Sequence, residues 1–163
     1  MRRLLFLDFD GVLHPDAVYL TRDVIELRAP GELFMWAPLL IEALAEHQDV
    51  RIVLSTSWAR NIGFDHARRA LPIALHHQVI GATWHSAMGR GWPDYILWDV
   101  QTRWEQIATY LSRLPAPVRW LAVDDDDRGW PADKREHLVH TNPDAGLAGH
   151  GAIDELCRKL GAL

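Results

Sequence analysis

The chain has 163 residues, a length that favours one domain and allows a hydrophobic core to form without disulfide bonds. Hydrophobic residues make up 48% of it and charged residues 24%, a balance that excludes a disordered chain or a fibre. The formal net charge of −5 excludes a global positive field of the kind that attracts nucleic acid, and leaves room only for a local basic patch. We therefore expect a single domain over residues 1–163.

Cysteine usage and hydropathy indicate the cellular compartment that the sequence favours. Cys157 is the only cysteine, which excludes an internal disulfide and a multi-cysteine zinc site and favours a reducing, cytoplasmic location. Asp8 and Asp10 interrupt the apolar run near the start, and no small-residue cleavage site follows, so this run indicates a strand and not a signal peptide. No stretch approaches about 18 uncharged apolar residues, so we expect no membrane span.

Strands and helices are predicted to alternate along the chain. Residues 4–7 form a continuous apolar run, which is typical of a strand buried on both faces. Residues 36–47 carry apolar side chains at helical spacing and predict a helix, and residues 52–54 predict a second buried strand. A short helix at residues 65–71 and a third strand at residues 79–84 follow.

The second half continues the alternation. Residues 86–98 are rich in Gly and Pro and predict a loop. Thr102 and Glu105 match a capping box, in which the two residues cap the first turn of a helix reciprocally, so a helix is expected to begin there. Residues 118–123 and 138–140 predict the fourth and fifth strands.

A closing helix completes the predicted fold. Ile153, Leu156, Cys157 and Leu160 share one face of it, so Cys157 is expected to be a small core residue. Strands that alternate with helices imply parallel pairing with right-handed crossovers. The sequence therefore predicts an α/β fold with a doubly wound, Rossmann-like parallel sheet.

Polar residues follow three of the predicted strands at the point where each ends. Asp8 and Asp10 follow the first strand, the hydroxyl residues 55–57 the second, and the acidic run 124–127 the fourth. In open α/β sheets, ligands bind outside the carboxyl ends of the strands. This coincidence of polar residues and strand ends is the main functional signal in the sequence.

The carboxylates at these ends predict a metal site. Gly11 allows the chain to turn after Asp10, so the side chains of Asp8 and Asp10 can face one site. Asp124 or Asp125 from another strand end brings three or four negative charges together, which is unfavourable unless a cation joins them. Magnesium is the expected ion, since it prefers oxygen ligands and is held by a few carboxylates, waters and a substrate phosphate.

These motifs carry a family resemblance. The run Leu-Phe-Leu-Asp8-Phe-Asp10-Gly11-Val12-Leu13 resembles the first motif of haloacid dehalogenase-like (HAD) phosphohydrolases, and the hydroxyl and Asp-Asp strand ends resemble their second and fourth motifs. The similarity in motif, order and spacing covers almost the whole chain. Trp58, after the hydroxyls, and the segment 142–147 are similar to a compact subgroup, the HAD domain of Swiss Army Knife RNA repair proteins.

The resemblance implies a catalytic role for each matching position. Asp8 is the expected nucleophile, and it forms an aspartyl-phosphate intermediate. Asp10 is the expected general acid and base. Thr56 is expected to donate a hydrogen bond to a phosphoryl oxygen, with Ser55 as the alternative register; Ser55 and Gly11 are the expected substrate-binding positions.

The same resemblance implies a metal set and a basic residue. The side chain of Asp8, the backbone carbonyl of Asp10, and Asp125 or Asp124 are expected to hold Mg²⁺. The family's third motif is usually a lysine, but no lysine occurs before Lys134.

Arginine is the available replacement for that lysine. Arg103 is the expected residue, because the capping box puts it in the first turn of the helix before the fourth strand, and Arg90 is the alternative. Arginine keeps the charge but has a planar, forked geometry.

Substrate size depends on what covers the site. Residues 14–35 and 59–101 leave room for little beyond the core elements, so no cap or a minimal cap is expected and the site should be open. An open site admits a phosphate on a macromolecule, such as a nucleic acid end or a protein, and also a nucleotide or a small phosphate ester. A small basic patch of Arg60, Arg68 and Arg69 is the candidate contact for a nucleic acid end.

The leading function is thus a Mg²⁺-dependent phosphomonoester phosphatase, and two other classes compete with it. One is a catalytically silent HAD-fold binding or regulatory module, which the complete set of crowded carboxylates disfavours. The other is a phosphoacceptor receiver domain, whose phosphorylated Asp would lie on a middle strand and not in an N-terminal Asp-x-Asp-Gly.

Histidines and tryptophans are numerous, at nine and eight. A zinc site at His76, His77 and His85 is not expected, because no cysteine is near and no His-x-x-x-His occurs. Most tryptophans are expected in the core, with one or two near strand ends available to stack on a base or sugar. His14 is expected either to touch the substrate or to support the loop after the first motif.

Overall fold

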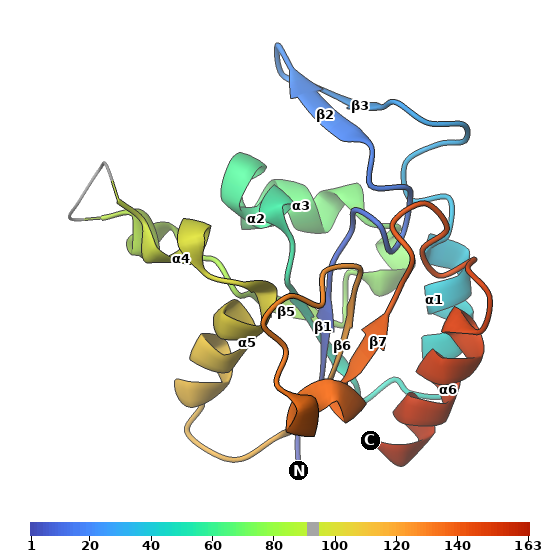
Figure 1. The fold of residues 1–163 in the computed structure, drawn as a ribbon, viewed down its shortest axis with the longest axis vertical. Helices are drawn as coiled ribbons and strands as arrows, with labels where there is room; N and C mark the ends of the chain where they lie inside the picture. Colours follow the sequence, from blue (N-terminus) through green and yellow to red (C-terminus); the bar gives the residue numbers. More distant parts are fainter. Residues whose placement is uncertain (91–94) are drawn as a thin grey trace.

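A five-stranded parallel sheet forms the centre of the computed structural model, which describes residues 1–90 and 95–163 (Figure 1). The strand order is β5-β4-β1-β6-β7, and every neighbouring pair is parallel. This architecture confirms the predicted fold class. The strands are β1 (Arg3–Leu7), β4 (Arg51–Leu54), β5 (Val79–Ala82), β6 (Arg119–Asp124) and β7 (Leu138–His140).

The sheet is covered on both faces, as the unbroken apolar runs require. Leu5 and Leu7 of β1 belong to the hydrophobic cluster on one face, and Leu4 and Phe6 belong to the cluster on the other. All four side chains are fully buried, and each such burial stabilises the fold by roughly 1.5–3 kcal/mol. Helices α1 (Ala37–Leu44) and α6 (Ala152–Ala162) pack on the first face and α5 (Arg103–Ser112) on the second (Figure 1).

The capping box at the start of α5 is present as predicted. The Thr102 hydroxyl accepts a hydrogen bond from the Glu105 backbone N–H at 3.3 Å, and the Glu105 carboxylate accepts one from the Thr102 N–H at 2.7 Å. Because this cap sets where α5 begins, it also sets the position of Arg103 on the first turn.

A β-hairpin that the sequence analysis did not predict follows β1. It consists of β2 (Val18–Thr21) and β3 (Val24–Leu27), joined by Arg22 and Asp23, which both have positive φ angles of 46° and 65°. The hairpin projects beyond the carboxyl ends of the sheet strands (Figure 1). The expectation of a minimal cap is therefore met by one small hairpin.

Several shorter elements refine the predicted boundaries. The predicted short helix is α3 (Phe64–Ala70), and an unpredicted helix, α2 (Ser57–Ile62), directly precedes it. The region predicted as a loop, 86–98, contains a 3-10 helix at Ser86–Gly89 and the beginning of α4 (Leu97–Val100), and part of it lies outside the described residues. Further 3-10 helices lie at Ile73–Leu75 and Ala132–His137.

One core prediction is wrong. Cys157 is exposed, whereas Leu156 and Leu160 of the same helix are fully buried. The buried stripe of α6 instead includes Lys159, whose ammonium donates to the Leu138 carbonyl at 2.6 Å and pairs with Glu155 at 2.7 Å. A long lysine side chain can cover apolar surface while its charged end finds partners, so hydropathy alone assigned the stripe incorrectly.

Tryptophans pack mainly in the interior, as predicted. Trp120 stacks on His137 with ring centroids 4.2 Å apart, and it also lies beside Trp104. The buried members include Trp58, Trp84, Trp98, Trp120 and Trp130.

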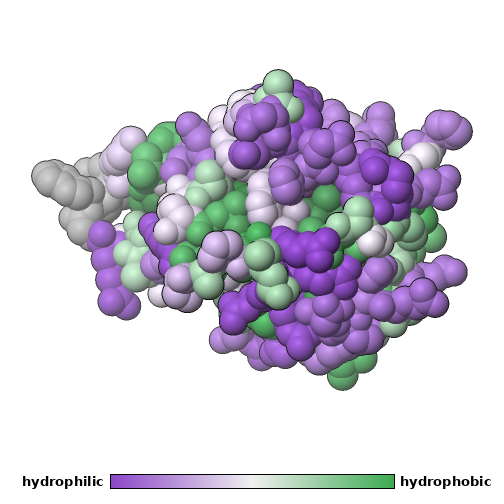
Figure 2. Space-filling view, turned by 90° about the horizontal axis from the view of Figure 1, so that it is seen from below, coloured by the Kyte–Doolittle hydropathy of each residue, from purple (hydrophilic) through white to green (hydrophobic). Residues whose placement is uncertain are grey.

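The end of the molecule at which the strands begin is mostly hydrophilic. Figure 2 shows this face, where hydrophobic residues form small separate patches among polar ones. Within residues 1–90 and 95–163, none of the helices has the length and hydrophobicity that a bilayer crossing requires.

Candidate active site

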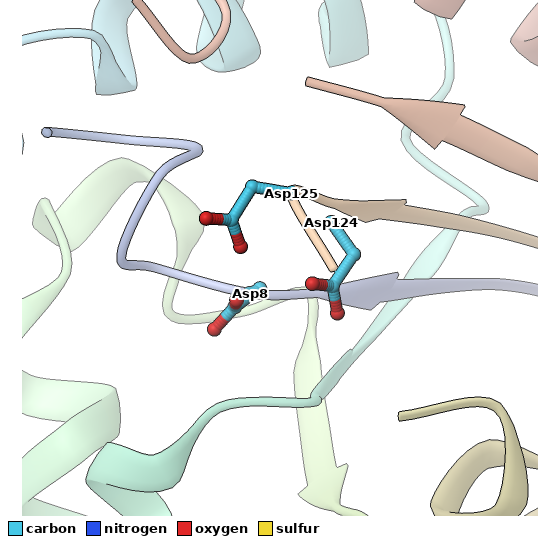
Figure 3. A group of neighbouring side chains, drawn as sticks. All are labelled: Asp8, Asp124 and Asp125. Atoms are coloured by element: carbon cyan, nitrogen blue, oxygen red, sulfur yellow. The ribbon is translucent and has the colours of Figure 1, made fainter. Parts of the chain in front are cut away.

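Three aspartates gather at the carboxyl ends of β1 and β6, the two neighbouring strands at the centre of the sheet. Asp8 follows β1, Asp124 ends β6, and Asp125 follows it. One carboxylate oxygen of each lies within 4.8 Å of the others (Figure 3). The chain leaves β1 toward one edge of the sheet and β6 toward the other, so this is the switch point at which such sheets bind ligands.

Gly11 makes this close approach possible. Its φ of +75° is one that residues with a Cβ rarely adopt, and an added Cβ would overlap the Asp125 carboxylate. The Thr141 hydroxyl donates to the Gly11 carbonyl at 2.6 Å, in a buried position. The turn after β1 is therefore closed on one side by Asp125 and held on the other by the residue after β7.

The segment 142–147 holds the same loop further along. The Leu147 N–H donates to the Val12 carbonyl at 3.0 Å, and the Asp16 N–H donates to the Pro143 carbonyl at 2.8 Å. The Asn142 side chain accepts a hydrogen bond from the Asp144 N–H at 2.8 Å, which keeps the segment in a tight turn. The segment 142–147, which was part of the family resemblance, therefore supports the loop after β1.

Arg103 reaches the aspartates from the first turn of α5. Its Nε lies 2.8 Å from Asp124 Oδ2, and its Nη2 lies 3.4 Å from Asp8 Oδ2. Burial alone would lower the pKa of Arg103, but the Asp8 and Asp124 charges raise it, so the guanidinium stays protonated. A second hydrogen bond, from Nη1 to the Gln106 side chain at 3.1 Å, orients the fork.

Burial and neighbouring negative charges raise the pKa values of all three aspartates. Burial is the main cause of the rise in the pKa of Asp8 to about 6, with the Asp10 charge adding to it and Arg103 opposing it. Burial and the Asp8 charge raise the pKa of Asp125 to about 7, and that of Asp124 well above its ordinary value. One arginine does not neutralise three carboxylates, so the cluster favours an additional cation.

The donor set fits a hard divalent cation. Asp8, Asp124 and Asp125 offer carboxylate oxygens, and oxygen is the ligand type that Mg²⁺ takes from proteins. The Asp10 carboxylate is not part of this group, so only its backbone carbonyl stays a candidate ligand. Both Asp124 and Asp125 belong to the group, and the structure therefore does not select one over the other.

Asp10 is held by two donors on one oxygen. Its Oδ1 accepts from the Trp58 indole N–H at 3.0 Å and lies 2.8 Å from His14 Nε2. His14 Nδ1 accepts from the Phe34 N–H at 3.1 Å, which leaves the ring proton on Nε2, directed at Asp10. In the described part of the chain, Asp10 Oδ2 has no hydrogen-bond partner, so it is free to exchange a proton with a ligand.

His14 is fully buried, which selects the second of its two predicted roles, support of the loop. The sequence analysis missed that it and Trp58 meet at Asp10. No spacing in the chain signals this contact, because the two residues come from different elements.

An acidic cavity of about 450 Å³ lies in front of these groups. Asp126 and Asp127 also border it, but Arg128 and Arg135 pair with them at 2.6 and 2.7 Å, which offsets these two charges. The lining residues are Asp8, Asp10, Asp16, Ser57, Arg103, Asp125, Asp126, Asp127, Arg128 and Pro143.

A family profile described as HAD domain in Swiss Army Knife RNA repair proteins matches residues 4–151. The chain belongs to this family. The match confirms the resemblance drawn from the motifs, and it supports a hydrolase of the phosphatase type. Comparisons with curated proteins and with solved structures gave no match.

Two of the three hydroxyl residues that follow β4 in this HAD domain are buried. Thr56 is fully buried and its hydroxyl accepts from the Trp58 N–H at 3.3 Å, so it caps α2. Ser55 is also buried, and its hydroxyl has no partner among the described residues. Ser57 borders the acidic cavity, although the sequence analysis did not single it out because it did not predict α2.

For the basic position of the HAD domain, the geometry favours Arg103 over Arg90. Arg103 contacts two of the clustered aspartates, as described above. Arg90 is exposed after the 3-10 helix at Ser86–Gly89, and it is not among the described residues that line the cavity.

Proposed function

We propose that the protein is a Mg²⁺-dependent phosphomonoester phosphatase that works through an aspartyl-phosphate intermediate. One observation carries this proposal: Asp8 and Asp10 border the same cavity, with Arg103 beside Asp8. A nucleophile, a proton donor and a positive charge are thus available to one phosphoryl group.

In the first step, an Asp8 carboxylate oxygen attacks phosphorus. The bond from phosphorus to the ester oxygen breaks, its electron pair goes to that oxygen, and the Asp10 carboxylic acid supplies the proton. Arg103 balances negative charge on the phosphoryl oxygens. The product alcohol leaves, and Asp8 carries the phosphoryl group.

In the second step, Asp10, now a carboxylate, takes a proton from a water molecule that attacks phosphorus. The bond between phosphorus and the Asp8 oxygen breaks, which releases inorganic phosphate and restores both aspartates to their starting states. The free Oδ2 of Asp10 fits this alternation, since Oδ1 is fixed by Trp58 and His14.

Asp8, Asp124 and Asp125, with the Asp10 backbone carbonyl, are the residues that would hold Mg²⁺. A bound Mg²⁺ supplies positive charge that lowers repulsion between the carboxylate nucleophile and the anionic substrate. Thr56, with Ser55 as the alternative register, stays the proposed hydrogen-bond donor to a phosphoryl oxygen, because a hydroxyl that accepts from the Trp58 N–H can still donate its own proton. We include Ser57 as a further phosphoryl contact because it borders the cavity.

The substrate is proposed to be a phosphate ester that an open cavity can admit, including a nucleotide or a nucleic acid end. The arginine patch does not strengthen the nucleic acid alternative. Arg60 pairs with Asp99 at 3.0 Å, Arg68 donates to the His76 carbonyl, and Arg69 donates to a backbone carbonyl in its own helix. A reducing, cytoplasmic setting is part of the proposal, and the exposed thiol of Cys157 agrees with it.

Hydrolysis of para-nitrophenyl phosphate, with Mg²⁺ and with a chelator, tests the proposal. We expect activity only with Mg²⁺, and a loss of at least ~1,000-fold in kcat for Asp8→Asn, because a nucleophile has no substitute. Asp133→Asn is the matched control, since Asp133 is an exposed aspartate that pairs with Lys134 and does not border the cavity.

If the phosphatase proposal fails, the alternative is a catalytically silent binding module. Wild type and Asp8→Asn would then be equally inactive on the aryl ester, on nucleotides, on phosphorylated RNA ends and on phosphopeptides.

A further inference from the structure

A second, smaller cavity lies between the β2–β3 hairpin and α2. Its volume is about 90 Å³, room for about three water molecules at ~30 Å³ each, or for one small ring. Most of its lining is hydrophobic. The apolar side chains come from both elements and are Val18, Leu20, Ile25, Trp58 and Ile62.

This recess adjoins the acidic cavity. Asp10 and Ser57 line both, so the two spaces meet at these residues. Asp10 thus stands at the boundary between a strongly charged space that holds Asp8 and an apolar space behind the hairpin.

Proton transfer determines what must lie at this boundary. The acid that protonates a leaving group must come within hydrogen-bond distance of the ester oxygen. With phosphorus next to Asp8 and the ester oxygen next to Asp10, the carbon that bears this oxygen points away from the aspartate cluster. Asp10 also lines the recess, so a leaving group whose ester oxygen contacts Asp10 is placed next to the recess.

Resting on the proposed phosphatase function, we propose that the recess binds the leaving group, and that the substrate is a phosphate monoester with a compact, apolar, ring-sized group next to the ester oxygen. The lining favours such a group over a charged one, because five of the eight residues that line the recess are apolar and the other three are Asp10, Ser57 and Asn61.

The hairpin explains why the recess is available. Leu20 is 51% exposed although it faces the recess, and covering it with an apolar ligand removes its side chain from water. Leu20 pairs with Ile25 across the hairpin, so the two lie on one face of the ribbon. Val24 is 61% exposed and does not line the recess, which makes it a matched reference on the same hairpin.

Two esters of weakly acidic alcohols test the inference by hydrolysis. We expect kcat/KM to be at least about tenfold higher for benzyl phosphate than for methyl phosphate, since a well-placed apolar group is worth this much in a pocket. Leu20→Asn should lower the benzyl-to-methyl ratio roughly fivefold, whereas Val24→Asn should leave the ratio unchanged. Equal kcat/KM values for the two esters in the wild type, or equal ratios in all three proteins, would overturn the inference and leave the phosphatase proposal intact.

A binding measurement keeps the inference testable if no ester is hydrolysed. Benzylphosphonate and methylphosphonate have no ester oxygen to lose, and their dissociation constants can be measured by calorimetry in the presence of Mg²⁺. We expect benzylphosphonate to bind the wild type about tenfold more tightly, and Leu20→Asn to reduce this difference. Equal affinities would reject the recess as an apolar subsite, whether or not the protein is a phosphatase.

Discussion

At the scale of single residues, the two donors on Asp10 Oδ1 make the two oxygens of this carboxyl group different. Trp58 and His14 occupy one oxygen at 3.0 and 2.8 Å, and the other oxygen is available to the ligand. In the proposed mechanism, this second oxygen must point at the leaving group to transfer a proton. We therefore propose that the two donors affect the reaction through the orientation of Asp10.

Trp58→Phe should therefore weaken proton donation more than it weakens attack by Asp8. We expect kcat for phenyl phosphate to fall about tenfold more than kcat for para-nitrophenyl phosphate, because losing a hydrogen bond to a charged group costs roughly 1.5 kcal/mol and nitrophenolate leaves readily without a proton. Steady-state kinetics on the two esters measure this difference. Trp84→Phe is the control, since Trp84 is equally buried but packs in a separate cluster. An equal fall on both esters would assign Trp58 to packing alone.

Sequence reasoning reached the acidic residues of the site but not the residues that orient them. Asp8, Asp124 and Asp125 follow apolar strands, and a strand end in a parallel sheet has a known place. Trp58 and His14 meet Asp10 only after the loop following β1 and the start of α2 have folded against each other. That meeting depends on tertiary structure, which leaves no periodic signal in the chain.

At the scale of elements, the turn after β1 depends on Gly11. Gly11→Ala should destabilise the protein by about 2 kcal/mol or more, because the positive φ is strained with a Cβ and the added carbon would displace Asp125. Thermal unfolding measures the effect. Gly161→Ala is the matched control: Gly161 lies in α6 with open space around its Cα, so alanine should stabilise by about 0.5–1 kcal/mol. A neutral Gly11→Ala would contradict the close approach of Asp125.

The β2–β3 hairpin shows which elements the sequence does not reveal. β2 and β3 contain short apolar runs, Val18-Tyr19-Leu20 and Val24-Ile25, but Tyr19, Leu20 and Val24 are exposed. Runs of two or three apolar residues that face solvent are too short to distinguish a strand from a loop. The turn of the hairpin is Arg22-Asp23, although Asn-Gly and Asp-Gly are the pairs that usually signal such a turn. Closely spaced short elements such as α2 are missed for a related reason, since one or two turns give too few periods to detect.

At the scale of the whole molecule, the crowded aspartates link stability to pH. The pKa values of Asp8 and Asp125, about 6 and about 7, exceed their ordinary value of 3.8, so the folded state binds more protons than the unfolded state in the window between. Without a divalent cation, the free energy of unfolding should therefore fall as the pH rises from about 4 to about 7. Chemical denaturation across this range in a chelating buffer measures how the free energy of unfolding depends on pH. A free energy of unfolding that rises between pH 4 and 7 would contradict the raised pKa values of these aspartates.

Magnesium should offset the loss of stability that we expect at high pH. Its ligands must be deprotonated, so Mg²⁺ should stabilise the protein more at pH 8 than at pH 5. At a concentration 100 times the dissociation constant, the gain is about 2.7 kcal/mol, or roughly 5–10 °C in Tm for a chain of this size. Asp125→Asn should lose most of the Mg²⁺-dependent shift in Tm, whereas Asp133→Asn should retain it. A shift equal at both pH values would argue against carboxylate ligands.

The central sheet was predictable because the local sequence of each strand indicates how the strand packs in the folded protein. Four consecutive apolar residues in β1 can be satisfied only between two covered faces, and the strands and helices that alternate after β1 then require parallel pairing. The α6 helix marks the limit of this reasoning, since its buried stripe includes Lys159 and excludes Cys157.

The bonds that hold the loop after β1 also bear on when the site forms during folding. Asp8 and Gly11 lie near the beginning of the sequence, but Thr141, which donates a hydrogen bond to Gly11, lies 130 positions after Gly11. Joining such distant segments costs loop-closure entropy before the contacts compensate for it, so these bonds form late. In a nascent chain that has not yet released β7 from the ribosome, Asp8, the proposed nucleophile, would precede an unsupported loop. Any phosphoryl transfer by this protein should therefore begin only after the last strand has joined the sheet.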